Sequence, residues 1–337
     1  MRRLLPPTAY REPRRVHGHA MHPPWCIAGP ITIALALIIG TVLLFPSPNL
    51  YGKLIWNKDT GWVDPITLNP RIPDQHFKLA LAMMVDQQYD SAVKEFQAVL
   101  EKSTEADMVE ACLYSIAQAY LLAGKYKKAF HAYEDFLERL PGTRLSGQVL
   151  EKEFQAGVAL MGGPKPTASV EIFEKVIEHN PKGPLAPESQ VKIADAYFTA
   201  MEYDNAEEAY RKLLENYPKS EWAPYAMFRI PLSKLSLERM RERDLGRLWK
   251  AREGFEEYLG NYPTGSFAEE AKKQIHDTEE LIAQRQYQIA ELYLRKKHPQ
   301  AAMVHFEGVI NHFPNTPWAE KSREPIEFLK KINAAKK

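Results

Sequence analysis

The feature that most constrains the fold is a pattern of small and aromatic residues that recurs along most of the chain. The clearest copy, KIADAYFTAMEYDNAEEAYRKLLENYP, places Ala194 and Ala206 twelve residues apart. Tyr197 and Tyr210 follow these alanines at helical spacing, and Pro218 follows the second half of the copy. Small residues let two helices cross closely, aromatic side chains fill the space beside the crossing, and proline ends a helix. Each copy is therefore predicted to be a helical hairpin.

The same register occurs in five further copies, and each has a small residue at the position of Ala206. These reference residues are Ala92, Ala129, Ser169, Ala251 and Ala302, at spacings of 37 to 51 residues. Twelve residues before the reference, a second alanine recurs as Ala80, Ala117 and Ala290. This is the tetratricopeptide (TPR) pattern, and no segment of strand periodicity competes with it. We predict an all-α fold, a right-handed α-solenoid of about six TPR-like helix pairs preceded by one transmembrane helix.

The transmembrane prediction rests on an uncharged run of 19 residues, Ile27–Phe45. At about 1.5 Å per residue, a helix of this length crosses a hydrocarbon core of about 30 Å. Five arginines precede the run, which favours a cytoplasmic N-terminus unless translation starts at Met21 and removes them. We predict a basic cytoplasmic tail at 1–25 and a transmembrane helix at 26–45; a cleaved signal is the alternative.

The segment between the apolar run and the repeats, residues 46–72, is predicted to be an extended linker. It is rich in proline and glycine, and it contains Trp56 and Trp62. These tryptophans leave open a second interpretation, in which the segment forms a tethered strand that docks onto the first helix pair.

Composition and motifs exclude several classes of function. Residues 72–337 carry 36 basic and 40 acidic residues, so phosphate neutralisation does not drive binding and no nucleic acid is expected. The only cysteines, Cys26 and Cys112, cannot form a disulfide framework. The histidines of the repeats lack metal spacing, and the chain has no glycine-rich phosphate loop, HExxH or GxSxG. We predict that the protein is not an enzyme and binds no metal or cofactor.

The first helix of each pair is expected to line a protein-binding groove, at positions that lie off the contact face with the second helix. Aromatic and aliphatic residues there suit recognition of a helix or an extended peptide. For any single one of these side chains, the alternative is that a neighbouring repeat covers it, so that it does not face a groove. The predicted groove residues are Phe77, Leu81, Met84, Tyr114, Gln118, Leu121, Val191, Asp195, Phe198, Tyr287, Glu291 and Leu294.

The fourth to sixth copies share a longer signature between repeats. It reads YPKSEWAPYA from Tyr217, YPTGSFAEEA from Tyr262 and FPNTPWAEKS from Phe313. This signature resembles the BamD family of outer-membrane protein assembly factors, over about residues 185–330, whereas residues 73–184 are generic TPR units. The resemblance implies a non-catalytic periplasmic scaffold of the bacterial envelope that acts in outer-membrane β-barrel protein assembly. Its implied partners are envelope proteins, such as a β-barrel assembly protein or its unfolded clients.

The N-terminal segment departs from that family. BamD-like proteins are normally lipoproteins held through a modified N-terminal cysteine, but here the apolar run follows Cys26 instead of preceding it. The expected location is therefore a single-pass membrane protein of the envelope, with its N-terminus in the cytoplasm and its TPR array in the periplasm. One alternative is an inner-membrane-tethered adaptor for another envelope machine, in cell division, secretion or pilus assembly. Another is a regulator of an enzyme, with the array in the cytoplasm.

Overall fold

The computed structural model describes residues 55–57, 61–63, 73–241 and 244–335. By its contacts the chain separates into two units, 1–53 and 54–337, and all described residues belong to the second. The tail predicted at 1–25 and the transmembrane helix predicted at 26–45 lie outside the described residues. Among the helices that are described, none combines the length and the hydropathy needed to cross a membrane.

A two-stranded antiparallel hairpin occurs within the segment predicted as a linker. Strand β1 (Ile55–Asn57) pairs with β2 (Gly61–Val63), and Trp56 lies opposite Trp62 in the register. The two tryptophans are therefore cross-strand neighbours in one short hairpin.

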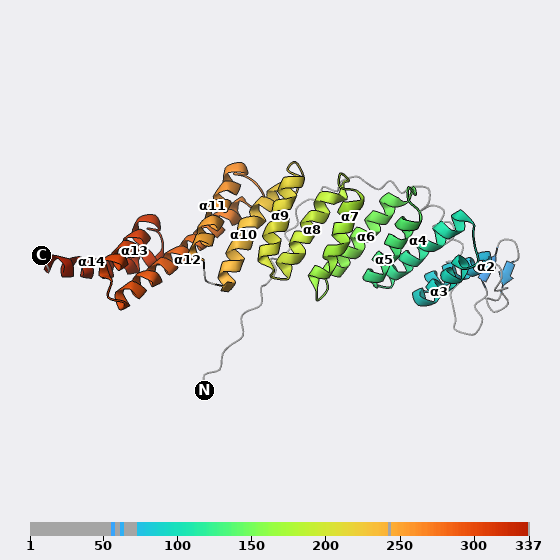
Figure 1. The fold of residues 1–337 in the computed structure, drawn as a ribbon, viewed down its shortest axis with the longest axis horizontal. Coiled ribbons are helices and arrows are strands. Elements are labelled where there is room, and N and C mark those ends of the chain that lie inside the picture. Colours follow the sequence, from blue (N-terminus) through green and yellow to red (C-terminus); the bar gives the residue numbers. More distant parts are fainter. Residues whose placement is uncertain (1–54, 58–60, 64–72, 242–243, 336–337) are drawn as a thin grey trace, which may run out of the picture. The chain divides into compact units, whose positions relative to one another are not determined.

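Residues 73–335 form helices that stack side by side in chain order (Figure 1). Successive helices pack as antiparallel pairs, and a last helix, α14, packs against α12 and α13. This part of the chain is an all-helical TPR-like solenoid, as predicted. The pairs are α2 (Pro73–Val85) with α3 (Tyr89–Leu100), α4 (Ala106–Leu122) with α5 (Tyr126–Arg139), α6 (Ser146–Met161) with α7 (Val170–His179), α8 (Leu185–Thr199) with α9 (Tyr203–Asn216), α10 (Ala223–Arg241) with α11 (Leu245–Asn261), and α12 (Ala268–Arg295) with α13 (Pro299–His312), before α14 (Pro317–Ala335).

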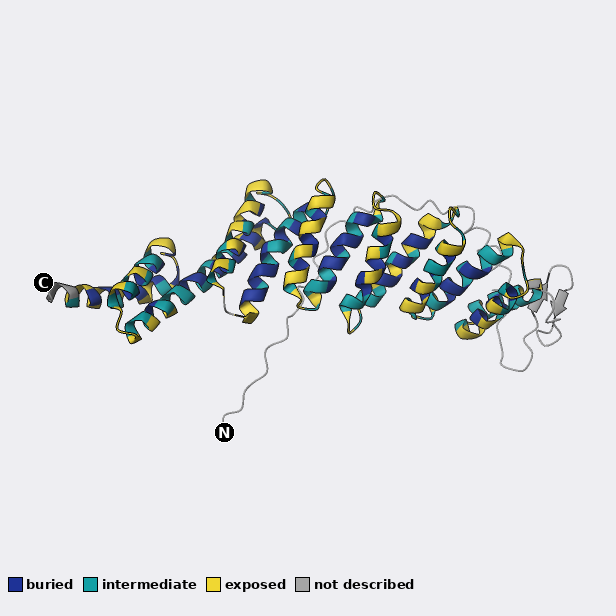
Figure 2. Ribbon diagram, viewed as in Figure 1, coloured by how far each residue is buried: buried dark blue, intermediate teal, exposed yellow. Residues whose placement is uncertain are grey.

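The repeated small residues lie where the two helices of a pair cross. All of them are fully buried, and so are the aromatic residues four positions after each reference residue; buried residues line the interior of the stack (Figure 2). Their side chains leave room for close approach, and the large rings fill the adjacent space at the density of a protein core. The buried rings are Phe96, Tyr133, Phe173, Tyr210, Phe255 and Phe306, whereas Tyr197 is half-buried.

The third pair uses a glycine at the crossing. Gly157 lies twelve residues before Ser169, at the position that alanine occupies in the first, second, fourth and sixth copies. A Cβ atom on Gly157 would lie 2.8 Å from Cε1 of Phe173, so no larger side chain fits without displacing that ring. The second helix of this pair begins with a short 3-10 turn, η2 (Pro166–Ser169), in which the buried Ser169 hydroxyl donates to the carbonyl of Pro166 at 2.7 Å.

The irregular spacing of the last copies is taken up by longer helices. The polar stretch 236–248 forms the end of α10 and the start of α11, around the undescribed residues 242–243. Asp244 caps α11, because its Oδ1 atom accepts hydrogen bonds from the backbone N–H of Gly246 at 2.8 Å and of Arg247 at 3.3 Å. The 51-residue spacing that follows is accommodated by the 28 residues of α12.

Candidate protein-binding groove

The first groove position of most pairs holds an aromatic ring that packs edge-on against the buried ring of its own second helix. The ring centroids are 5.4 Å apart for Phe77 and Phe96, 6.0 Å for Tyr114 and Tyr133, and 5.3 Å for Tyr287 and Phe306. Each of the first-helix rings is half-buried. These rings therefore stabilise the hairpin with one edge and present the rest of their surface outside the core.

One predicted groove residue, Val191, is buried, and one further residue, Phe154, lies in the predicted groove register. Val191 is fully buried, because it packs in the cluster that α8 and α9 form with Ala226 of α10. It is a core residue and does not line an open groove. The third pair, for which no groove residue was predicted, places Phe154 in the same register, 5.5 Å from Phe173. The signal for Phe154 was its position 15 residues before Ser169, which matches Tyr114 before Ala129.

At the next two predicted groove positions the side chains are apolar in the first and third pairs, whereas the second pair has Gln118 followed by Leu121. Leu81, Met84 and Leu121 are half-buried, and Val158 of α6 is 37% exposed in the same register as Leu81. Gln118 accepts a hydrogen bond from the hydroxyl of Tyr133 at 3.0 Å. The predicted groove positions of these pairs are therefore mostly apolar.

In the fourth pair the same positions carry a polar network that reaches α10. Asp195 accepts hydrogen bonds from the hydroxyls of Tyr210 and of Tyr225, the latter at 2.8 Å, and Arg229 donates from Nε to the Tyr210 oxygen at 2.9 Å. The guanidinium carbon of Arg229 also lies 3.7 Å from the centre of the Phe198 ring. Burial and the neighbouring Asp195 carboxylate raise the pKa of Tyr225 to about 12, so its hydroxyl remains a donor at neutral pH. The network fixes Asp195 and Phe198 in place.

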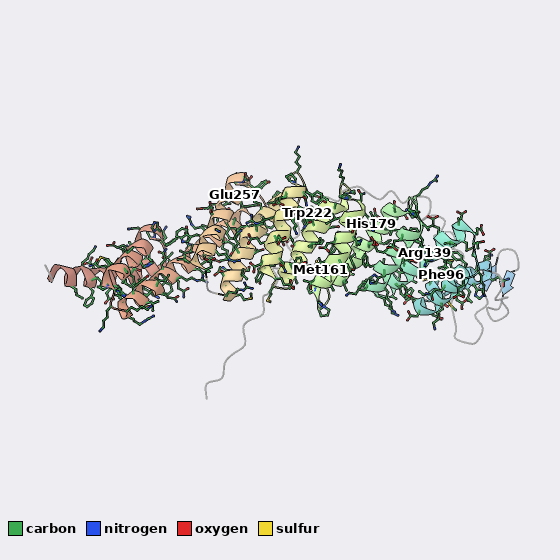
Figure 3. The ribbon with its side chains drawn as sticks, in the orientation of Figure 1. Phe96, Arg139, Met161, His179, Trp222 and Glu257 are labelled. Atoms are coloured by element: carbon green, nitrogen blue, oxygen red, sulfur yellow. The ribbon has the colours of Figure 1, made fainter. Side chains whose placement is uncertain are left out.

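The sixth pair contributes Glu291 and Leu294, which are both half-buried on α12. Near them, the ring of Trp318 from α14 lies 5.4 Å from Tyr287, and the Nζ atom of Lys321 lies 4.2 Å from the Trp318 ring centre. Trp222, which is labelled in Figure 3 and precedes α10, packs against the buried cluster of α8 and α9. Both tryptophans therefore connect neighbouring repeats.

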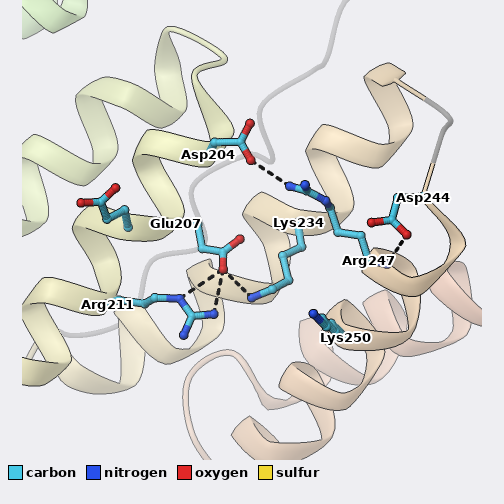
Figure 4. Close-up of a pocket in the computed structure, with 8 residues that line it drawn as sticks. Asp204, Glu207, Arg211, Lys234, Asp244, Arg247 and Lys250 are labelled. Atoms are coloured by element: carbon cyan, nitrogen blue, oxygen red, sulfur yellow. Dashed lines mark hydrogen bonds and ion pairs between the residues drawn. The ribbon is translucent and has the colours of Figure 1, made fainter.

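A separate pocket of about 420 Å³ lies among α9, α10 and α11 and is lined by four acidic and four basic residues (Figure 4). Glu207 pairs with Lys234 at 2.8 Å and with Arg211 at 2.7 Å, and Asp204 pairs with Arg247 at 2.8 Å. Burial opposes the charge on Glu207, but the two cations outweigh it and hold the pKa of this carboxyl below its usual value. These ion pairs connect two neighbouring repeats. Because the acidic and basic charges compensate one another, the pocket does not favour a ligand of either charge.

A third cluster joins the second and third pairs. Glu134 of α5, Glu153 of α6 and His179 at the end of α7 place one ligand atom each within 4.8 Å of the others. The His179 Nε2 atom lies 2.7 Å from Glu134 Oε1. Burial and the neighbouring Glu134 carboxylate raise the pKa of Glu153 to about 9. The sequence did not indicate this cluster, because its members come from three helices and are far apart in the chain.

The stacked helical hairpins define a TPR-repeat protein. A TPR family model matches residues 77–142, and the YfiO family model, described as outer membrane lipoprotein, matches residues 154–332. The second match spans more than half of the chain, which therefore belongs to the YfiO family. The resemblance to BamD-like proteins is thereby confirmed.

Individual relatives are more distant. The outer membrane protein assembly factor BamD of Rickettsia prowazekii is 24% identical over 163 residues, which are 48% of this chain and 65% of the relative. BamD of Xylella fastidiosa strain Temecula1 is 24% identical over 156 residues, 43% of this chain and 53% of the relative. The chain thus spans less than two thirds of these relatives. A solved C-terminal part of a TPR repeat-containing protein from Cytophaga hutchinsonii is 17% identical, with a TM-score of 0.36, over 75% of this chain and 88% of that chain.

Proposed function

We propose that this protein is a non-catalytic scaffold of the bacterial envelope that acts in outer-membrane β-barrel protein assembly. In this proposal the TPR array is a right-handed superhelix in the periplasm, and residues 26–45 anchor it in the membrane with the N-terminus in the cytoplasm. Its partners are envelope proteins, of which a β-barrel assembly protein or its unfolded clients are the first candidates. The match of the YfiO family to residues 154–332 carries this proposal.

The groove supports binding of an apolar or amphipathic segment. Its first three pairs present half-buried aliphatic side chains, including Leu81 and Leu121, beside aromatic rings that the hairpins hold in fixed positions. Rings that are already ordered lose little conformational entropy when a partner binds. The network around Asp195 adds a polar site where a partner can form directional hydrogen bonds.

The test is purification of the tagged full-length protein from native envelopes, with its partners identified by mass spectrometry. Val158→Asp combined with Leu121→Ala places a charge in the groove and truncates one anchor. Because a lost hot spot costs about 2 kcal/mol or more, we expect binding of a β-barrel assembly protein to weaken by about 30-fold or more.

The matched control is Val304→Asp, since Val304 is 67% exposed on α13, a second helix. This variant should retain the partner. If the groove variant keeps its helical circular dichroism spectrum and also retains every partner, the groove is not the binding surface.

A second candidate is an inner-membrane-tethered TPR adaptor for another envelope machine, in cell division, secretion or pilus assembly. The observation that favours it is the uncharged run Ile27–Phe45, which is long enough to remain in a membrane. Recovery of components of such a machine, without a β-barrel assembly protein, would favour this candidate over the first.

A further inference from the structure

The cluster of Glu134, Glu153 and His179 has features that the groove and the interhelical ion pairs do not explain. Glu153 is 0% exposed, and both of its carboxylate oxygens lack a hydrogen-bond partner. A buried carboxylate without a partner is costly, because it loses its hydration and gains nothing in return. Such a group requires a proton or a cation.

The repeat register shows that a carboxylate is unusual at this position. Glu153 lies 16 residues before Ser169, and the equivalent residues before Ala129 and Ala206 are Leu113 and Gln190. Leu113 belongs to the hydrophobic core, and Gln190 donates a hydrogen bond to the backbone carbonyl of Ala209 at 3.0 Å. The fold therefore does not need an acid at this place.

The other two ligand atoms come from groups that metals prefer. The Glu134 side chain is 14% exposed and the His179 side chain is 32% exposed; the two groups are in contact at 2.7 Å, and their ligand atoms lie within 4.8 Å of that of Glu153. The nearby cation, Lys175, pairs with Glu178 at 2.8 Å. Because His179 is the most exposed of the three side chains, an ion would reach the cluster from its side.

We propose that Glu134, Glu153 and His179 bind one zinc ion that clamps α5, α6 and α7 together. Two carboxylates and an imidazole form a ligand set that zinc accepts, at about 2.0–2.2 Å from each ligand atom, whereas calcium and magnesium prefer oxygen ligands alone. The three ligand atoms, which lie within 4.8 Å of one another, must draw closer around the ion, and the contact between His179 and Glu134 must open. A water molecule would fill the fourth position of a tetrahedral site.

The absence of metal spacing in the sequence does not conflict with this site. Metal ligands that lie on one helix or loop can be recognised by their short spacing in the sequence. These three ligands lie on three helices, and His179 follows Glu134 by 45 residues. Only the packing of the second pair against the third brings them together.

The experiment is isothermal titration calorimetry, in which zinc chloride is added to the full-length protein in detergent. His17, His19, His22 and Cys26 are first replaced, so that the N-terminal HGHAMH segment and its neighbouring thiol do not contribute. We expect one zinc ion per chain and a rise in melting temperature with zinc. Glu153→Gln keeps the size of the side chain but removes its charge, and it should weaken zinc binding at least tenfold and abolish the thermal shift.

Two further variants make the outcome decisive. His179→Asn changes an accessible side chain, so it tests the site even if Glu153→Gln fails to fold, and it should also weaken binding at least tenfold. The control is His76→Asn, because His76 contacts Glu95 at 2.6 Å but belongs to no such three-residue group within the described residues. Equal zinc affinity in the parent and both cluster variants would overturn the proposal, as would the absence of saturable binding; Glu153 would then share a proton with Glu134.

Discussion

The crossing of α6 and α7 gives the sharpest prediction, because two opposing effects of known size meet at Gly157. Replacing a helical glycine by alanine stabilises a helix by about 1 kcal/mol. Here, however, the new methyl group would lie 2.8 Å and 2.9 Å from two ring carbons of Phe173 and 3.3 Å from Cγ2 of Ile172. Favourable carbon contacts are about 3.5–4.0 Å, and Phe173 is fully buried and cannot move freely.

Overpacking of this kind costs about 1–3 kcal/mol, so Gly157→Ala should change the free energy of unfolding by about 0–2 kcal/mol in the destabilising direction. The control is Gly260→Ala in α11, where an added Cβ meets nothing within 4 Å. That variant should be neutral or stabilising. Urea unfolding followed by circular dichroism measures both. If Gly157→Ala instead stabilises the protein by the roughly 1 kcal/mol expected for an unhindered helical glycine, the proposed crossing is wrong.

Two further predictions concern charged groups in the fourth and fifth pairs. Arg229→Met removes a guanidinium that is 17% exposed and contacts Asp195, so it should lower the free energy of unfolding by about 1.5–3 kcal/mol. The control is Arg323→Met, which removes a 60% exposed partner of a surface ion pair and should change the free energy of unfolding by less than about 1 kcal/mol. Equal effects of the two substitutions would contradict the network around Asp195. Glu207 has a lowered pKa in the folded state, so it stabilises the fold above its unfolded pKa of 4.5, and this contribution disappears as the pH falls through the folded value. The stabilities of the wild type and of Glu207→Gln, measured by urea unfolding, should therefore differ most at neutral pH and converge as the pH falls below the folded pKa of Glu207. A difference that grows on acidification would refute the assignment.

The sequence determined the hairpins and their order. A helix pair forms from local information, because its small residues, its aromatic residues and its terminal proline all lie within about 30 residues of one another. For this reason the buried alanines, such as Ala117 and Ala206, could be placed from spacing alone. The same spacing placed Phe77, Tyr114 and Tyr287 off the contact face with the second helix, whereas each ring packs edge-on against a buried ring of that helix.

The tertiary structure decided what depends on neighbouring pairs. Val191 is buried because the α8–α9 pair and Ala226 of α10 close around it, and no periodicity within its own helix indicates this. Glu134, Glu153 and His179 meet because α5, α6 and α7 pack together, although their positions in the chain show no ligand spacing. Local pattern fixes which face of a helix is apolar, whereas the approach of the next repeat decides which residues remain accessible and which distant side chains become neighbours.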